Sequence, residues 1–338
     1  MPPGAVPEPA PVDAVVVTYQ NEADIAACLG ALARLPRPGR IVVVDHGSDR
    51  SGIIAGDLGA VVVEDPANPG FGAGQNRGVG LTSSRYVLLV NPDAVVEPAG
   101  IAAGVAVLDA SPDVAAVQGI VTDRRSGQPE RSAGTPLGPV HLFGRALHAR
   151  HLLRLPLVRR AVTHVPGFAA LADHVVRVPP GATDVEALGA TALLVRRGAF
   201  DAVGGFDQGY FLYGEDLDLC RRLRRDRWRL VTLPIPWATH AAGSSSSGWW
   251  DHELVWWEGA LHYAARWWSS GQWALARAAA AIQIVPMVAR HPERTGEVVE
   301  RLVYQHPVSG EKAVRMNEVP FYKHQTRLLI GDIPKIDP

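Results

Sequence analysis

The chain has 338 residues, of which 47% are hydrophobic and 20% are charged, and its formal net charge at pH 7 is −1. This composition excludes a largely disordered chain, and the near-neutral charge excludes a general attraction to nucleic acid. Two cysteines, Cys28 and Cys220, are too few for a disulfide framework and favour a reducing, cytoplasmic setting.

Short β-branched runs alternate with helix-like segments in the N-terminal part of the chain. The predicted strands are residues 12–18, 40–44, 60–64, 86–90 and 114–121. The predicted helices are residues 21–35, the end of the glycine-rich segment 68–80, and residues 98–110. This alternation predicts an α/β fold with a mainly parallel sheet covered by helices on both faces. Ligands of such sheets bind at the carboxyl ends of the strands.

The rest of the chain has a less regular pattern. Residues 122–185 are rich in Pro, Gly, Arg and His and are interpreted as an insertion. The elements expected after it are a strand within 185–195, helices at 197–203 and 216–225, a strand at 229–233 and helical structure over 249–290.

Four polar motifs follow one another along this pattern. The first combines the ends of two strands, Thr18-Tyr19-Gln20-Asn21-Glu22 and Asp45-His46; the second is the glycine-rich segment 68–80; the third is Asn91-Pro92-Asp93; the fourth runs from 189 to 219. The last motif delivers Glu215 and Asp216 to the start of a basic helix. A carboxylate placed there can take a proton from a sugar hydroxyl, and the turn that ends in Asp93 can hold a metal ion.

In order and spacing these motifs resemble family 2 glycosyltransferases of the GT-A fold, in particular the rhamnosyltransferase-like branch, over residues 12–247. Each motif is weak alone, whereas the ordered set is specific. The resemblance implies an inverting glycosyltransferase with a pyrimidine nucleotide-diphosphate donor, dTDP-rhamnose or a similar dTDP- or UDP-sugar. The implied acceptor is a hydroxyl of a glycan, lipid-linked or natural-product molecule.

The resemblance also implies a division of the chain. A flexible Pro-rich N-terminus precedes a GT-A domain, and a Trp-rich helical region and a tail of uncertain origin, which holds all three lysines, follow it. The bounds are 1–11, 12–247, 248–304 and 305–338, and the domain itself divides into a nucleotide-binding half (12–121), the insertion beside the acceptor site (122–185) and an acceptor half (186–247).

The implied nucleotide-sugar site lies in the turns after the first strands. Asp45 matches the aspartate that accepts a hydrogen bond from the imide N–H of uracil or thymine, a donor that cytosine lacks. Glycines let the backbone approach the diphosphate. The site residues are Thr18, Tyr19, Glu22, Asp45, Gly70, Phe71, Gly72, Asn76, Asn91 and Asp93. His46 replaces the usual asparagine, which leaves Asp49 unassigned. The alternatives are an ordinary turn with a capping aspartate and a glycine-rich loop that serves packing.

Asn91-Pro92-Asp93 stands where the family has Asp-x-Asp, and only the final carboxylate survives. Asp93 is expected to hold Mg²⁺ or Mn²⁺ alongside the sugar diphosphate, with His240 as a second ligand. The missing first aspartate weakens the case for a metal. A simple turn at Asp93 and a packing role for His240 are the alternatives.

Asp216 matches the general base of the family, and Glu215 is its acidic neighbour. The two adjacent carboxylates should raise one another's pKa, while Arg221 and Arg222 oppose this rise. The alternative is a helix N-terminus enriched in acids. Two other functions stay open. One is a non-catalytic sugar-nucleotide-binding protein; the other is a sugar-1-phosphate nucleotidyltransferase, which would need a glycine-rich basic loop after the first strand.

Seven of the nine tryptophans lie between Trp249 and Trp273. If residues 249–290 formed one helix, six of them would share one face: Trp249, Trp250, Trp256, Trp257, Trp267 and Trp268. Such a face, with five arginines in 145–160, predicts peripheral contact with the inner face of the membrane and a polyprenyl-diphosphate-linked acceptor. Core packing and a homodimer interface are the alternatives. The apolar stretch 273–289 is judged too short and too interrupted to span a bilayer.

Overall fold

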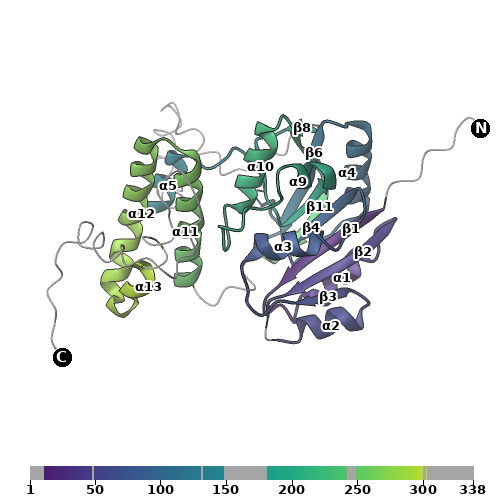
Figure 1. Cartoon of the computed structure of the whole chain (residues 1–338), viewed down its shortest axis with the longest axis horizontal. Helices are drawn as coiled ribbons and strands as arrows, with labels where there is room; N and C mark the ends of the chain where they lie inside the picture. The colour runs from purple at the N-terminus through teal and green to yellow at the C-terminus, as the bar shows by residue number, and fades with distance from the viewer. Residues whose placement is uncertain are drawn as a thin grey trace, which may run out of the picture.

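The computed structural model describes residues 11–47, 49–130, 132–147, 181–241, 249–299 and 302. Three features expected from the sequence lie largely outside these residues: the Pro-rich N-terminus, most of the insertion and the tail 305–338. Figure 1 shows a central sheet with helices on both sides and a separate group of helices near the C-terminus.

A mixed sheet of nine strands forms the centre of the molecule, in the order β3-β2-β1-β4-β10-β6-β11-β5, with β8 paired to β11. β10, β5 and β8 run antiparallel to their neighbours, whereas the other strands share one direction. The strands are β1 (Val12–Thr18), β2 (Pro38–Asp45), β3 (Val61–Glu64), β4 (Tyr86–Val90), β5 (Ala94–Val96), β6 (Val114–Asp123), β8 (Thr183–Asp184), β10 (Ala192–Arg196) and β11 (Arg229–His240). A small second sheet pairs β7 (Ala133–Gly134) with β9 (Ala187–Leu188). The expected mainly parallel α/β sheet is confirmed.

The central strands are buried on both faces, which explains their continuous apolar sequence. Along β1, Ala14 and Val16 enter the core on one face, and Val15 and Val17 enter the core on the other. The first face is covered by α1 (Ile25–Leu32), α2 (Ser51–Asp57) and α4 (Pro98–Ala110). The second face is covered by α3 (Phe71–Val79), α9 (Arg197–Ala202) and α10 (Glu215–Arg225).

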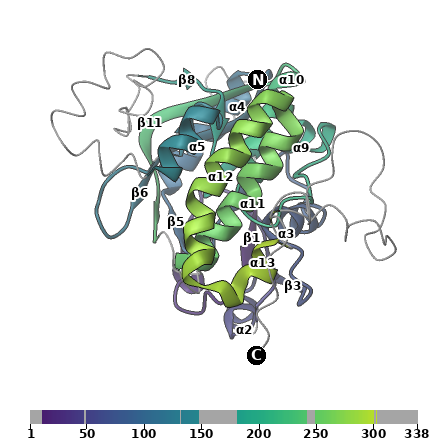
Figure 2. The same ribbon diagram turned by 90° about the vertical axis from the view of Figure 1, so that its left-hand side faces the viewer.

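A third apolar cluster joins α5 (Pro139–Ala146) to the helices near the C-terminus. These are α11 (Trp249–Trp267), α12 (Ser270–Arg290), η1 (Pro292–Arg294) and α13 (Thr295–Val299). α11 lies on the side nearer the sheet, and α12 lies farther out (Figures 1 and 2). α5 comes from the expected insertion, so residues far apart in the sequence share this cluster.

The expected helical structure over 249–290 is present, but as two helices, so the condition for a shared tryptophan face is not met. α11 ends at Trp267, and α12 begins at Ser270 with Ser269 as its N-cap, where the Ser269 side chain and Gln272 bond to each other's backbone N–H. Ser269 and Gln272 therefore make a capping box, a strong start signal that separates the two helices. The six tryptophans cannot share one helical face. Trp257 is fully buried, and its indole N–H donates to Gln283 of α12 at 3.3 Å.

One helix among the described residues, α12, is long and apolar enough to cross a membrane by length and composition alone. The helix has 21 residues. Its most apolar 18-residue window has a mean hydropathy of 1.2, and 33% of this window is buried inside the protein. Residues 273–289 were expected to be too short to span a bilayer, but the helix that contains them is long enough. The same test is passed by core helices of soluble proteins.

Other boundaries differ from the sequence prediction in smaller ways. The first helix begins at Ile25 because residues 22–24 form a turn. The strand expected within 185–195 is β10, preceded by the short strand β9, and the strand expected over 229–233 extends to His240. The short elements α5, β5, β7 and β8 were missed because few residues carry their periodicity.

Candidate active site

The predicted donor-side residues lie at one edge of the sheet. Thr18 pairs with Asp45 at the ends of β1 and β2, and Val16 of β1 pairs with Val90 at the end of β4. Asn91 follows β4, and its backbone N–H donates to the carbonyl of Thr191, just before β10, at 2.9 Å. The ends of three parallel strands and the beginning of β10 therefore meet at this edge.

The glycine-rich helix α3 connects this edge to the acidic motif at 215–216. A side chain at Gly74 would collide with His46, which follows β2, and a side chain at Gly72 would press on Phe206 and reach Glu215. The backbone N–H of Phe71 donates to the carbonyl of Phe211 at 2.9 Å. The turn after β2 and the start of α10 thus both border the N-terminal half of α3.

Gly70, the residue before α3, has a φ of 103°, in the region that favours glycine. A Cβ there would also meet the backbone of Phe211. Asn76, one turn into α3, holds the same neighbouring segment: its amide donates to the carbonyl of Phe206, and its carbonyl accepts from the Phe206 N–H, each at 2.8 Å. The glycine-rich motif therefore fastens α3 to the aromatic turn 206–213.

Asp45 is half-buried at the end of β2 and already accepts backbone hydrogen bonds. The Gly47 N–H donates to its Oδ1 at 2.9 Å, and the Gly52 N–H donates to the same carboxylate. Burial raises the pKa of Asp45 and outweighs these hydrogen bonds. A carboxylate has about four acceptor positions, so capacity remains for a further donor.

The first turn places its three predicted residues in different surroundings. The Thr18 side chain is fully buried, and its hydroxyl has no partner among the described residues. Tyr19 is 43% exposed and Glu22 is exposed. The Glu22 N–H donates to Asp49 at 2.9 Å, and Asp49 also accepts from the Ser51 N–H at 3.1 Å. Asp49 therefore organises the turn.

Asp93 and His240 lie side by side. His240 ends β11 and pairs with Ala94, the residue that follows Asp93. Its Nε2 lies 3.2 Å from Oδ1 of Asp93, and its Nδ1 lies 3.0 Å from Glu130. Burial alone would lower the pKa of His240, but hydrogen bonds with Asp93 and Glu130 outweigh it and raise the pKa to about 9.

The sequence analysis missed Glu130. It belongs to the segment expected to be an insertion, and its N–H donates to the carbonyl of Val121 at 2.8 Å, which brings its side chain to the end of β6. No sequence signal links it to a histidine 110 residues later. Among the described residues, no group of three or more His, Cys, Asp or Glu side chains that could hold a metal ion is found.

Glu215 and Asp216 open α10 after two residues with positive φ, Tyr213 at 67° and Gly214 at 91°. Such conformations persist only where their surroundings enforce them. Here α11 does so, because a side chain at Gly259 would collide with the carbonyl of Tyr213. The acidic pair is therefore presented by a turn that a distant helix braces.

Asp216 is partly exposed, whereas Glu215 is buried. Oδ1 of Asp216 accepts from the Leu217 N–H at 2.8 Å, and the Ala190 N–H also donates to this carboxylate. Burial raises the pKa of Asp216 against these two hydrogen bonds. Burial and the charge of Asp216 raise the pKa of Glu215 to about 8, so Glu215 keeps its proton near neutral pH.

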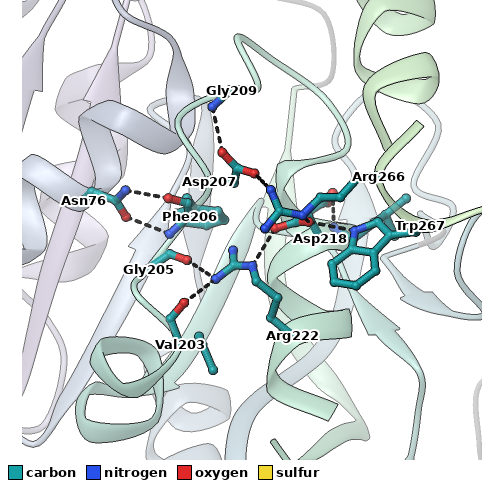
Figure 3. Close-up of polar contacts among 12 residues, drawn as sticks. Asn76, Val203, Gly205, Phe206, Asp207, Gly209, Asp218, Arg222, Arg266 and Trp267 are labelled. Carbon is teal, nitrogen blue, oxygen red and sulfur yellow. Dashed lines mark hydrogen bonds and ion pairs between the residues drawn. The ribbon is translucent and has the colours of Figure 1, made fainter. Parts of the chain in front are cut away.

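A buried polar network around Asp218 fixes the position of α10 (Figure 3). The Asp218 carboxylate is fully buried and accepts from Nε of Arg222 at 2.6 Å and from the Trp267 indole N–H at 2.8 Å. Nε of Arg266 lies 3.2 Å from the same carboxylate, and Arg266 also pairs with Asp207.

The network reaches the turn beside α3 as well. Arg222 donates to the carbonyls of Val203 and Gly205, next to the Phe206 that Asn76 holds. The i, i+4 spacing of Asp218 and Arg222 is visible in the sequence, whereas the partners from α11 are not. The network thereby joins α3, α10 and α11.

Comparisons with known proteins place the chain among transferases of sugars. The family model described as glycosyltransferase like family 2 matches residues 9–268. The N-acetylglucosaminyl-diphospho-decaprenol L-rhamnosyltransferase of Mycobacterium tuberculosis is 35% identical over 103 residues, covering 24% of this chain and 34% of that protein. The rhamnosyltransferase WbbL of Escherichia coli K12 is 42% identical over 64 residues, covering 19% and 24%. The matches thus span about a third or less of these curated relatives.

Two solved structures share the fold. A mannosyltransferase from Pyrobaculum calidifontis, PcManGT, in complex with GDP-Man and Mn²⁺, superposes with a TM-score of 0.51 at 16% identity, over 88% of this chain and 84% of that one. GalNAc-T7 with UDP, GalNAc and Mn²⁺ superposes with a TM-score of 0.55 at 12% identity, over 91% and 60%. At these identities the likeness establishes the fold, which confirms the expected GT-A architecture.

Proposed function

The chain belongs to the glycosyltransferase-like family 2, and from this premise we propose that it is an inverting glycosyltransferase with Asp216 as its general base. Its donor is a pyrimidine nucleotide-diphosphate sugar, with dTDP-rhamnose as the best candidate and UDP-sugars next. The observation that carries the proposal is the braced turn that presents a partly exposed Asp216 beside a buried Glu215.

In the proposed reaction Asp216 accepts the proton of an acceptor hydroxyl as that oxygen attacks the anomeric carbon of the donor sugar. The bond from the anomeric carbon to the phosphate oxygen breaks, and the nucleoside diphosphate leaves with the electron pair. The hydrogen bonds from Leu217 and Ala190 fix the carboxylate for this transfer. Glu215, kept neutral by its burial, places no second negative charge at the reacting centre.

Asp93 and His240 form a donor set that suits a divalent ion. A carboxylate oxygen and an imidazole nitrogen 3.2 Å apart can bind one Mg²⁺ or Mn²⁺ when the ring is neutral, and diphosphate oxygens and water complete such a shell. When bound, the ion neutralises charge on the leaving diphosphate. Glu130 holds the opposite ring nitrogen, which orients His240 towards Asp93.

The donor nucleotide is assigned to the edge formed by β1, β2 and β4. The Asp45 carboxylate accepts hydrogen bonds from Gly47 and Gly52 and still has free acceptor positions. One of these would accept the imide N–H of thymine or uracil. The N-terminus of α3 would face the diphosphate, since backbone N–H groups there favour anions. Thr18, Tyr19, Glu22 and Asn91 belong to the same edge. Asn76 acts through the turn that it holds.

The name of one curated relative points to the acceptor. That relative acts on N-acetylglucosaminyl-diphospho-decaprenol, according to its name. By analogy, a polyprenyl-diphosphate-linked glycan is the acceptor that we assign to this chain, with transfer taking place on the cytoplasmic side of the membrane. The exposed side of Asp216 is where the acceptor hydroxyl would enter.

The decisive experiment compares the wild-type protein with Asp216→Asn. Thermal unfolding is first measured with dTDP, UDP, GDP and CDP and their sugars, with and without Mn²⁺, because a ligand of the folded state raises its stability. Transfer of sugar from the donor that binds is then assayed. Asp216→Asn should lower the turnover number by about 10²- to 10⁴-fold while the thermal shift from the donor is retained.

Asp57→Asn, an exposed aspartate at the end of α2, is the matched control and should leave turnover unchanged. Full turnover in Asp216→Asn would remove Asp216 from the mechanism. Donor binding without turnover in the wild-type protein, for any acceptor offered, would favour the non-catalytic sugar-nucleotide-binding protein. Release of pyrophosphate from a nucleoside triphosphate and a sugar 1-phosphate would favour the nucleotidyltransferase.

A further inference from the structure

α12 presents a row of exposed apolar side chains, named here the α12 stripe. Leu275, Ile282 and Val285 are 46%, 43% and 62% exposed. Exposed alanines occupy the positions between them on the same side of the helix: Ala274, Ala278, Ala281 and Ala289. The stripe faces away from the buried side of α12, on the outer surface of the molecule (Figure 2). An exposed apolar row of this length marks an interaction surface, whereas single exposed side chains do not.

The charges that border the α12 stripe are positive. Residues 270–290 contain no Asp or Glu, and Arg277 and Arg290 are their two charged residues. Both arginines are exposed and form no ion pair within the part of the chain that the structure describes. At about 100° per residue, Arg277 falls on one margin of the stripe, whereas Arg290 falls in line with the buried Ala279 and Gln283 and is exposed where the helix ends.

More arginines gather where α12 begins. The guanidinium groups of Arg221 and Arg225 lie 4.9 and 5.3 Å from the ring centre of Trp267. Only Trp268 and Ser269 separate that tryptophan from α12. Arg277 therefore borders the apolar row along one margin, Arg290 lies at its C-terminal end, and two arginines of α10 lie near the beginning of α12.

This pattern distinguishes between possible occupants of the surface. In a two-fold symmetric dimer the stripe would face a copy of itself, and Arg277 would be buried without an acidic partner from either α12. At a bilayer surface the arginine stems lie along the apolar chains while their head groups reach lipid phosphates. Anionic lipid also attracts each arginine near the surface. The charge pattern complements an anionic bilayer.

The packing of α12 decides between lying on the bilayer and crossing it. Ala276, Ala279, Ile284 and Met287 on its inner side are buried in the cluster shared with α5 and α11. Crossing the bilayer would expose this inner side to lipid and remove the packing of Trp257 against α12. A helix with one face buried in protein and the other apolar and arginine-flanked lies in the plane of the interface.

We propose that the α12 stripe docks the protein on the surface of an anionic phospholipid bilayer, with α12 lying in the plane of that surface. In α11, Trp257 is buried and Trp256 packs against the same apolar cluster, so the aliphatic side chains of α12 take the role that the tryptophans suggested in the sequence. This proposal goes beyond the proposed function and does not depend on the identity of the donor.

The test is flotation of the full chain with vesicles, without donor or acceptor. Vesicles of phosphatidylcholine with an equal amount of phosphatidylglycerol are compared with phosphatidylcholine alone, at low and high salt. The wild-type protein should float with the anionic vesicles at low salt and be released as salt rises. Val285→Glu should weaken binding by at least about tenfold, because a charge replaces an inserted apolar group. Arg277→Gln combined with Arg290→Gln should reduce the preference for anionic lipid.

Ile53→Glu on α2 is the matched control, since Ile53 is 60% exposed and lies outside the α12 stripe. It should bind vesicles as the wild-type protein does, and all variants should keep the wild-type melting temperature because the substituted side chains are exposed. Failure of the wild-type protein to float, or equal flotation of Val285→Glu, would overturn the proposal. So would light scattering that shows a dimer which Val285→Glu dissociates, because the stripe would then be an interface between copies.

Discussion

The proposed donor side of the candidate active site and its proposed acceptor side hold their carboxylates in different ways. Asp45 ends a strand and takes hydrogen bonds from Gly47 and Gly52, two and seven residues away. Asp216 opens a helix whose position depends on Arg266 and Trp267, about fifty residues further along the chain. Local turn chemistry therefore places the first carboxylate, and contacts between distant helices place the second.

This difference predicts how substitutions act. Changes on the donor side should alter nucleotide preference and leave the rest of the molecule undisturbed. Changes in the network around Asp218 should alter both stability and turnover, because the same contacts support the fold and orient α10. The C-terminal helices belong to the active site in this sense, although none of their side chains is assigned to the reaction.

The largest effect is expected for Asp218→Ala. Removing this fully buried carboxylate leaves Arg222 without its partner and ends the hydrogen bond with Trp267. The free energy of unfolding should fall by about 3–5 kcal/mol, as for other buried ion pairs that lose one member. Denaturant unfolding measures the loss. Turnover of the folded protein should fall as well, while the thermal shift caused by the donor stays the same.

Asp226→Ala is the control, since Asp226 is exposed at the end of the same helix and its side chain bonds only to Trp228 among the described contacts. It should change the free energy of unfolding by less than about 1 kcal/mol. Equal stability of Asp218→Ala and the wild-type protein would contradict the view that long-range contacts hold the acceptor side.

A smaller effect is expected for Glu130→Ala. Glu130 acts on the metal ion through His240, so losing it should weaken Mn²⁺ binding by about 10- to 100-fold. Glu130→Gln should recover part of this affinity, because its amide oxygen still accepts from Nδ1–H. Paramagnetic resonance of free Mn²⁺ in the presence of nucleoside diphosphate measures the affinity.

Glu186→Gln is the control for Glu130, since Glu186 pairs with Arg224 at the surface and should leave Mn²⁺ affinity unchanged. Unchanged affinity in both Glu130 variants, together with a loss in Asp93→Ala, would show that Glu130 does not position His240. Unchanged affinity in Asp93→Ala would instead remove the proposed metal site.

The donor side was predictable because its signals are short in sequence. Five strands and the helix at Pro98–Ala110 were found from β-branched runs, Gly and Pro, and the ordered motifs placed Asp45, Asn91 and Asp93 at strand ends. The parallel sheet then brings these ends together without further information. Asp93 and His240 were paired from family resemblance, and the β5–β11 register places them side by side.

The acceptor side could be predicted only in part. The sequence identified Glu215 and Asp216, but not the network that supports them, since Arg266 and Trp267 meet Asp218 only in the fold. Tryptophan spacing suggested one shared face, whereas the capping residue Ser269 divides the segment into two helices and Trp257 is buried against the second. Periodicity describes a helix but not the neighbour against which it packs.

Glu215→Gln should change how stability depends on pH. The pKa of Glu215 rises from an ordinary value of 4.5 to about 8 on folding, so between these values the folded state holds a proton that the unfolded chain has lost. The contribution of Glu215 to the free energy of unfolding is therefore complete at pH values below 4.5. It decreases as the pH rises towards about 8, by up to about 1.4 kcal/mol per pH unit.

Gln cannot ionise, so Glu215→Gln should remove this slope and gain stability relative to the wild-type protein as pH rises from 5 towards 8. Unfolding experiments at several pH values measure the difference between the two proteins, in which the shared contribution of His240 cancels. Parallel pH profiles would mean that burial does not hold the proton on Glu215, and Asp216 would then work beside a second negative charge.

The smallest effect is expected for Asp45→Asn, which tests the local character of the donor side. An amide presents one acceptor oxygen and a donor group, so it pairs less well with the imide of uracil and can donate to the ring nitrogen of cytosine. The preference for UDP over CDP should fall by about tenfold, the difference made by one altered hydrogen bond. Isothermal titration with each nucleotide measures this preference.

Because Asp45 also accepts hydrogen bonds from Gly47 and Gly52, the variant should lose only about 1 kcal/mol of stability, and turnover with saturating donor should be retained. A loss of turnover as large as that of Asp218→Ala would show that the two sides of the site are coupled, and an unchanged nucleotide preference would mean that Asp45 serves the turn after β2 alone.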